Sequence, residues 1–139
     1  MARYASVDDI ERIGLPPAAT VDIDPEVLEG HLDTASGKID TYLRSNYRLP
    51  LSQPYPQEIV DAAARIAAYT FLVWRGFNPD SYDANFRDLY LDLVGRPGQS
   101  GWLDKLAAGK VHLAATADAT PNYREGRARV ASARRRGWD

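Results

Sequence analysis

The sequence contains no cysteine, and this absence removes several classes of chemistry at once. Without a thiol the chain forms no disulfide, builds no thiolate zinc site and offers no cysteine nucleophile. The absence is compatible with a reducing cytoplasm but does not require one. Of the 139 residues, 45% are hydrophobic and 26% are charged, which predicts one globular domain with a modest core.

Long apolar segments are missing as well. No apolar run approaches the roughly 20 residues that a membrane-spanning helix needs. The first residues, MARYASVDD, lack the basic-then-apolar pattern of a signal peptide. We therefore expect a soluble protein that is made in the cytosol and does not associate with membranes.

Residues that usually carry catalysis or bind metals are sparse. His31 and His112 have no partner histidine three or four residues away. Asp22 and Asp24 form a carboxylate pair, but Asp24 is better explained as a helix cap, and hard cations need more oxygen ligands. Phosphate-loop, dinucleotide-binding, nucleophile-elbow and HExxH motifs are absent. We expect no metal site and no cofactor, and we predict that the protein is not an enzyme.

Helical periodicity is what the sequence does contain. Apolar residues recur at helical spacing, and the segments between these runs are rich in proline and glycine. The expected helices span 6–14, 25–47, 57–76, 81–94 and 102–108, with Ser100 capping the last of them. Residues 95–101 read as a flexible break, and 111–115 as a short strand or extended segment.

The predicted fold class is therefore all-α. We expect a small bundle of four to five helices, built on a long antiparallel hairpin of the second and third helices. The helical domain should span residues 1–115, and an extended C-terminal arm should span 116–139.

The third helix has two kinds of face. Its buried stripe is expected to consist of Ile59, Ala62, Ala63, Ile66, Tyr69, Thr70 and Val73. Phe71 and Trp74 are expected on the side away from Ile59 and Ile66. Because aromatic residues are enriched where subunits meet, we predict that Phe71 and Trp74 contact a neighbouring subunit.

Charge is distributed unevenly along the chain. Residues 121–139 carry a net charge of +4, whereas the remaining residues carry −6. The arginine-rich C-terminal segment could be a silent terminus, an arm that binds phosphates, or a segment that orders on a protein partner. Tyr123, Val130 and Trp138 supply apolar anchors among the arginines, which favours a protein partner slightly.

Four ordered blocks of sequence resemble one family of small tailed-phage proteins. The first block is an N-terminal segment with Met1, Tyr4, Ala5, Ser6 and Asp9. The second is ASGKIDTYLRSNYRLPL at 35–51, and the third is a helix with Ile59, Ala63, Ile66, Ala67 and Tyr69, and approximately Leu72. The fourth is WLDKLAAGKVHL at 102–113. Together they resemble the Mu-like head-to-tail connector (adaptor) proteins over residues 1 to about 115. The glycine-rich segment 95–101 departs from the pattern, because it splits a helical region that is usually more continuous.

The resemblance implies a structural role in the virion neck. Such adaptors form a ring under the portal protein, twelve-fold by family resemblance, that extends the DNA channel and receives a stopper or tail terminator. Genomic DNA would pass through the channel without sequence-specific binding, and the net-negative body suits this because it would not hold phosphates. In related connectors the C-terminal segment reaches onto the portal. The corresponding residues here are Tyr123, Arg124, Arg127, Arg129, Arg134, Arg135, Arg136 and Trp138.

The junction after the second helix completes the predicted subunit interface, through Tyr47, Leu49 and Leu51. We expect this junction to fix the geometry of the hairpin rather than to bind a ligand. The alternative function is a small helical regulator that binds nucleic acid through its basic tail.

Overall fold

The chain is described by a computed structural model that covers residues 3–49 and 51–113. Its elements are listed here in chain order: α1 (Val7–Arg12), the 3₁₀ helix η1 (Pro17–Thr20), α2 (Pro25–Leu43), α3 (Gln57–Arg75), α4 (Asp83–Val94) and α5 (Trp102–Ala107). No strand occurs within these ranges, and the prediction of an all-α fold is confirmed. None of the described helices is long and apolar enough to cross a membrane.

Local capping signals set where the first helices begin. The Ser6 side chain accepts a hydrogen bond from the backbone N–H of Asp9, and the Asp9 carboxylate accepts one from the N–H of Ser6. This reciprocal capping box satisfies two N–H groups that a helix start leaves free. Asp24 caps α2 in a similar way, and Pro25 stands at its first position, where no N–H is needed.

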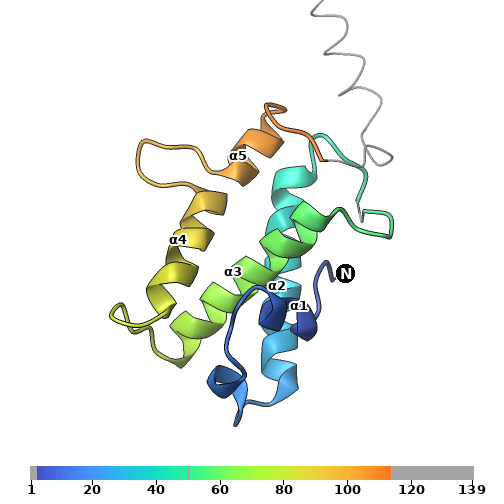
Figure 1. Cartoon of the computed structure of the whole chain (residues 1–139). Helices are drawn as coiled ribbons and strands as arrows, with labels where there is room; N and C mark the ends of the chain where they lie inside the picture. The colour runs from blue at the N-terminus through green and yellow to red at the C-terminus, as the bar shows by residue number, and fades with distance from the viewer. Residues whose placement is uncertain (1–2, 50, 114–139) are drawn as a thin grey trace, which may run out of the picture.

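The helices form a compact arrangement around α3. Figure 1 shows α2 and α3 lying along each other in opposite directions, as expected for a helical hairpin. The N-terminal segment and α1 cross this pair on one side, while α4 contacts α3 and α5 bridges α4 and α2. Because α1, α2 and α4 all contact α3, this helix is buried over most of its circumference.

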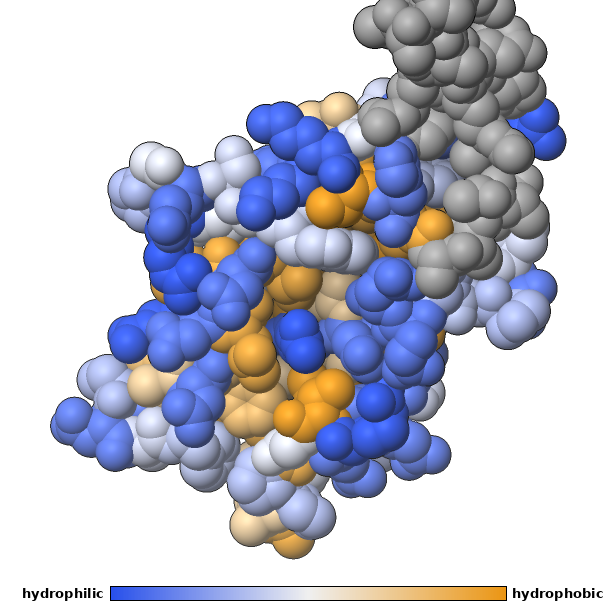
Figure 2. Space-filling view, turned by 45° about the horizontal axis from the view of Figure 1, so that its top comes forward, coloured by the Kyte–Doolittle hydropathy of each residue, from blue (hydrophilic) through white to orange (hydrophobic). Residues whose placement is uncertain are grey.

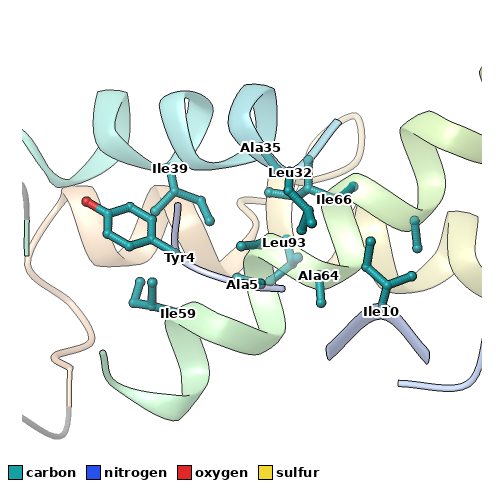
Figure 3. Packing of buried hydrophobic residues seen from close by; sticks show 14 of the residues in the cluster. Tyr4, Ala5, Ile10, Leu32, Ala35, Ile39, Ile59, Ala64, Ile66 and Leu93 are labelled. Atoms are coloured by element: carbon teal, nitrogen blue, oxygen red, sulfur yellow. The ribbon is translucent and has the colours of Figure 1, made fainter. Parts of the chain in front are cut away.

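The core is formed by apolar side chains from every α-helix. Figure 3 shows Tyr4 lying between Ile39 of α2 and Ile59 of α3, and Ile10 of α1 facing α3. Of these, Ile10, Ile39 and Ile59 are fully buried. The N-terminal segment is therefore part of the core rather than a loose lead-in to the first helix.

The expected buried stripe of α3 is wrong in its last turns. Val73 is 50% exposed, whereas Phe71, which was expected on the opposite side, is fully buried. The buried positions instead continue through Ala64, Ala67, Ala68, Phe71 and Leu72. The reason is that a helix contacted from three sides has no single stripe for periodicity to reveal.

The expected end of the second helix is also corrected. The helix stops at Leu43, and Tyr47 lies beyond it. The backbone N–H of Tyr47 donates a hydrogen bond to the Leu43 carbonyl at 2.9 Å. Of the two alternatives expected for 111–115, the strand is wrong for the described part, because Val111 to Leu113 form no strand.

Residues 95–101 form a tight connector instead of a flexible break. Arg96 and Gln99 exchange two backbone hydrogen bonds, of 3.0 and 2.8 Å. The N-cap of α5 is Gly101 rather than Ser100, and the Asp104 carboxylate accepts the N–H of Gly101. A Cβ atom at Gly101 would lie 2.3 Å from the carbonyl oxygen of Leu93, so the connector packs directly on the end of α4.

Candidate partner-binding surfaces

Tyr4 joins the N-terminal segment to both helices of the hairpin. Its backbone N–H donates to the Ser36 hydroxyl at 2.9 Å, and its own hydroxyl donates to the Asp40 carboxylate. The same hydroxyl accepts the N–H of Leu51 at 3.4 Å, just before α3. Burial and the bond to Asp40 raise the pKa of Tyr4, which therefore stays a neutral donor. This network fixes three distant segments relative to one another.

Arg3 extends this attachment at the surface. Its guanidinium donates to both carboxylate oxygens of Asp33, at 2.7 and 3.1 Å, and lies 3.8 Å from Glu29. The hydrogen bond from Arg3 lowers the pKa of Asp33. Because all three side chains are well exposed, this pairing orients the segment more than it stabilises the fold.

A second set of polar contacts closes the opposite side of the hairpin. The Asn46 amide donates to the carbonyl oxygens of Leu106 and Ala107, at 3.2 and 2.8 Å. These carbonyls belong to the end of α5, where the regular helix no longer supplies N–H partners, although the Leu106 carbonyl also accepts the N–H of Gly109 at 3.2 Å. The Tyr47 hydroxyl accepts the N–H of Leu113 at 3.2 Å. The junction after α2 therefore holds α5 and the last described residue of the chain.

The turn between α3 and α4 is built around a buried carboxylate. Asp83 is completely buried and accepts a hydrogen bond from Arg75 at 2.8 Å and one from the N–H of Asn78 at 2.9 Å. A buried charge needs such partners to offset its desolvation. The group fixes the direction in which α4 leaves α3.

An aromatic cluster lies between the first half of α2 and the last turn of α3. The His31 ring lies 6.1 Å from the rings of both Phe71 and Trp74, and those two rings are stacked 6.0 Å apart. Burial lowers the pKa of His31. Phe71 is buried, but Trp74 is 57% exposed, so the cluster presents an indole to its surroundings.

One hollow of the surface uses charged groups of its lining internally. It has a volume of about 540 Å³ and runs beside residues 3–9. Two charged groups in its lining, Arg3 and Asp9, already serve the pairing with Asp33 and the cap of α1. Within the part of the chain that the structure describes, no group of three or more histidine, cysteine or carboxylate side chains could hold a metal ion.

The residues predicted at a subunit interface occupy different environments. Tyr47, Leu51 and Phe71 are buried inside the chain, so they act first in its own core. Leu49 is half-buried and Trp74 is exposed. Trp74 is therefore the predicted interface residue that is most available to another molecule. The predicted portal-binding residues, from Tyr123 to Trp138, lie outside the described residues.

Comparison with known proteins gives one match, and it covers almost the whole chain. A family model described as "Bacteriophage Mu, Gp36" matches residues 4–132. The chain belongs to the bacteriophage Mu Gp36 family. No curated protein and no solved structure matches it.

Family membership confirms the expected Mu-like phage origin and makes the chain a phage structural or morphogenesis protein. The match begins at Tyr4, the residue that joins the N-terminal segment to the hairpin. It ends at residue 132, beyond the region of about 115 residues over which the resemblance could be seen in the sequence. Much of the basic arm is thus part of what this Gp36-family chain shares with its family.

In this Gp36-family chain, several residues of the blocks singled out in the sequence form contacts between distant segments. Tyr4, Ser36 and Asp40 meet in one network, and Tyr47 reaches from the second block to Leu113 in the fourth. Sequence reasoning identified these residues but not their contacts with one another. The available signal for the contacts of Tyr4 was that this tyrosine and the block containing Ser36 and Asp40 occur in the same sequence. Their joint occurrence does not show that they lie close together in space.

Proposed function

We propose that the protein is a head-tail adaptor of the virion neck. In this role copies of the chain form a ring under the portal protein, twelve-fold by resemblance to related adaptors. The ring extends the DNA channel and receives the next neck component, a stopper or tail terminator. The observation that carries the proposal is the family match, which includes the helical body and most of the basic arm in one unit.

The structure supports this proposal in two respects. Tyr4, Asp40 and Tyr47, which carry the resemblance in the sequence, hold distant segments of the body together, as a scaffold for assembly requires. None of the contacts described above assembles a nucleophile with a base. The body has a net negative charge, which would let DNA slide past it without being retained.

In the proposed mechanism the arm attaches the ring to the portal. Residues 116–139 are long enough to extend well away from the body, since an extended chain gains about 3.3 Å per residue. Six arginines provide charge complementarity for an acidic portal surface, and Tyr123 and Trp138 provide apolar anchors.

Deletion of residues 121–139 tests the proposal. The truncated protein should keep its circular dichroism spectrum and melting temperature, because the described core ends at Leu113. It should fail to bind purified portal protein in a pull-down and should be missing from virion necks. Unchanged portal binding and incorporation would contradict the proposal. If the full chain instead bound DNA in a salt-dependent way that deletion abolished, the nucleic-acid regulator would be favoured.

A further inference from the structure

The exposed apolar side chains of the body gather at one end of the hairpin. Among the described residues the large exposed hydrophobic side chains are Val21 (75%), Trp74 (57%), Val73 (50%) and Tyr82 (38%). Val21 lies between η1 and α2, Val73 and Trp74 lie in the last turn of α3, and Tyr82 precedes α4. Figure 1 shows these segments together at its lower end. We call the surface formed by these four residues the apolar end.

Carboxylates surround the apolar end. Asp22, Asp24, Glu26 and Asp80 are all exposed there, and none of them forms an ion pair within the described chain. The two arginines of this region are already engaged. Arg75 is paired with the buried Asp83, and Arg87 lies 5.4 Å from the ring of Phe77. The apolar end therefore combines an exposed indole with an excess of negative charge on the neighbouring segments.

The opposite end of the hairpin has the opposite charge. Four exposed cations, which form no ion pair with described residues, lie there: Arg44, Arg48, Lys105 and Lys110. The Asn46 contacts hold the junction after α2, which carries Arg44 and Arg48, against the end of α5, which carries Lys105 and precedes Lys110. Two carboxylates lie nearby, Asp104, which caps α5, and Glu58 at the start of α3. We call the four cations the basic end.

The space-filling view shows the kinds of side chain on this face. Figure 2 turns the upper end of the molecule toward the viewer, where hydrophilic side chains surround a few apolar ones, and apolar atoms also occur across the middle of the face and at the lower tip. The dipole of α2 accounts for the signs of charge near its two ends, because acids suit a helix start and cations a helix end. It does not account for an exposed tryptophan and two exposed valines at one of them.

We infer that the apolar end of one copy docks on the basic end of a second copy of this chain. The two surfaces have complementary charge, and among the described residues the charges of both form no ion pair. A contact between unlike ends is heterologous, and repeated contacts of this type close into a ring when the rotation per copy allows it. Trp74 is the central anchor of the contact, and the charges at its rim orient the approach. The inference deepens the proposed adaptor function, since it names the surfaces that would join neighbouring subunits of the ring.

Two variants of the full chain block the two ends separately. Trp74→Glu blocks the apolar end, and the double variant Arg44→Glu/Arg48→Glu blocks the basic end. All three side chains are exposed, so circular dichroism and thermal melting should match the wild type. Thr34→Glu, at an exposed position midway along α2, is the matched control.

Sedimentation velocity over a concentration series measures the contact without the portal. The wild type should self-associate below about 1 mM, more weakly at high salt. Trp74→Glu should weaken self-association about thirtyfold, the loss typical of an interface anchor. The double variant should be weakened to a similar degree, and Thr34→Glu should behave as the wild type. An equimolar mixture of the two blocked variants should form a one-to-one dimer and nothing larger, because one complementary pair of ends remains intact.

Several results would overturn the inference. These are a wild type that stays monomeric at about 1 mM, unchanged self-association of Trp74→Glu, and a mixture that stays monomeric. If the double variant associated as the wild type does, the basic end would not be the occupant, and the arm of a neighbouring copy would become the candidate. Failure of the adaptor function is a separate result, because portal binding is measured with the arm deletion, which leaves both ends intact.

Discussion

Arg75 in the last turn of α3 donates a 2.8 Å hydrogen bond to Asp83 in the first turn of α4, and the carboxylate that it meets is completely buried. The second oxygen of Asp83 accepts the N–H of Asn78 at 2.9 Å. The Asp83 side chain thus provides a hydrogen-bond acceptor both for the Arg75 guanidinium and for a backbone N–H of the turn between α3 and α4. The direction of α4, and with it the position of α5, depends on this carboxylate.

We predict that Asp83→Ala lowers the free energy of unfolding by about 3 kcal/mol, because it leaves Arg75 and the Asn78 N–H without their partner. Chemical denaturation checks this value. Asp80→Ala is the control, since Asp80 is exposed in the same turn and should change stability by less than about 0.5 kcal/mol. Equal losses in the two variants would show that the buried carboxylate has no special role.

Tyr4→Phe tests the attachment of the N-terminal segment. The substitution keeps the ring between Ile39 and Ile59 but removes the hydroxyl that bonds to Asp40 and Leu51. We expect a loss of about 2 kcal/mol, because one of these bonds is made to a charged group. Tyr55→Phe is the comparison, since the hydrogen bond that this hydroxyl accepts from Gln53 is an exposed one. A loss as small as that of the comparison would mean that the network contributes little.

The connector 95–101 gives a prediction about backbone packing. Gly101→Ala places a methyl group 2.3 Å from the Leu93 carbonyl oxygen and 2.4 Å from the Gly95 nitrogen, both backbone atoms. The end of α4 and the start of α5 must separate, and we expect a loss of about 2–3 kcal/mol. Gly30→Ala, in open space on α2, should instead stabilise the protein by up to about 1 kcal/mol. A neutral Gly101→Ala would indicate that the connector is not tightly packed.

His31 should make stability depend on pH. Burial lowers its pKa in the folded protein, so below pH about 6.5 the unfolded chain takes up a proton more readily than the folded one does. Stability is therefore expected to fall as the pH decreases from about 6.5 toward the folded pKa. Melting temperatures between pH 7 and 5 should show this slope in the wild type and a smaller one in His31→Gln. His112→Gln is the control, and an unchanged slope in His31→Gln would refute the prediction.

Much of the fold could be predicted from the sequence because its signals are local. Ser6 and Asp24 mark the starts of α1 and α2, and Pro56 precedes α3 where a new helix was expected. Caps and prolines act within a few residues of their own position, so they can be recognised without knowledge of the fold.

The remaining features depend on contacts between distant residues. Phe71 was placed on the wrong side of α3 because its burial depends on distant segments, among them His31 on α2, forty residues earlier. The glycines of 95–101 looked like a flexible linker, yet Gly101 is required by the close approach of α4. Among the predicted interface residues, exposure separated Trp74 from Tyr47, Leu51 and Phe71, and periodicity alone contains no information on exposure at the end of a helix.

The hydrogen bond from Leu113 to Tyr47 also has a mechanical meaning. Leu113 is buried, and its N–H is held by a side chain that belongs to the hairpin junction rather than to α5. A pull on the chain beyond Leu113 therefore reaches the hairpin directly. The six-residue α5 and the glycine-rich connector lie outside this path, so tension would not unwind them first. The body can thus take up force from its arm through its most extensively packed pair of helices.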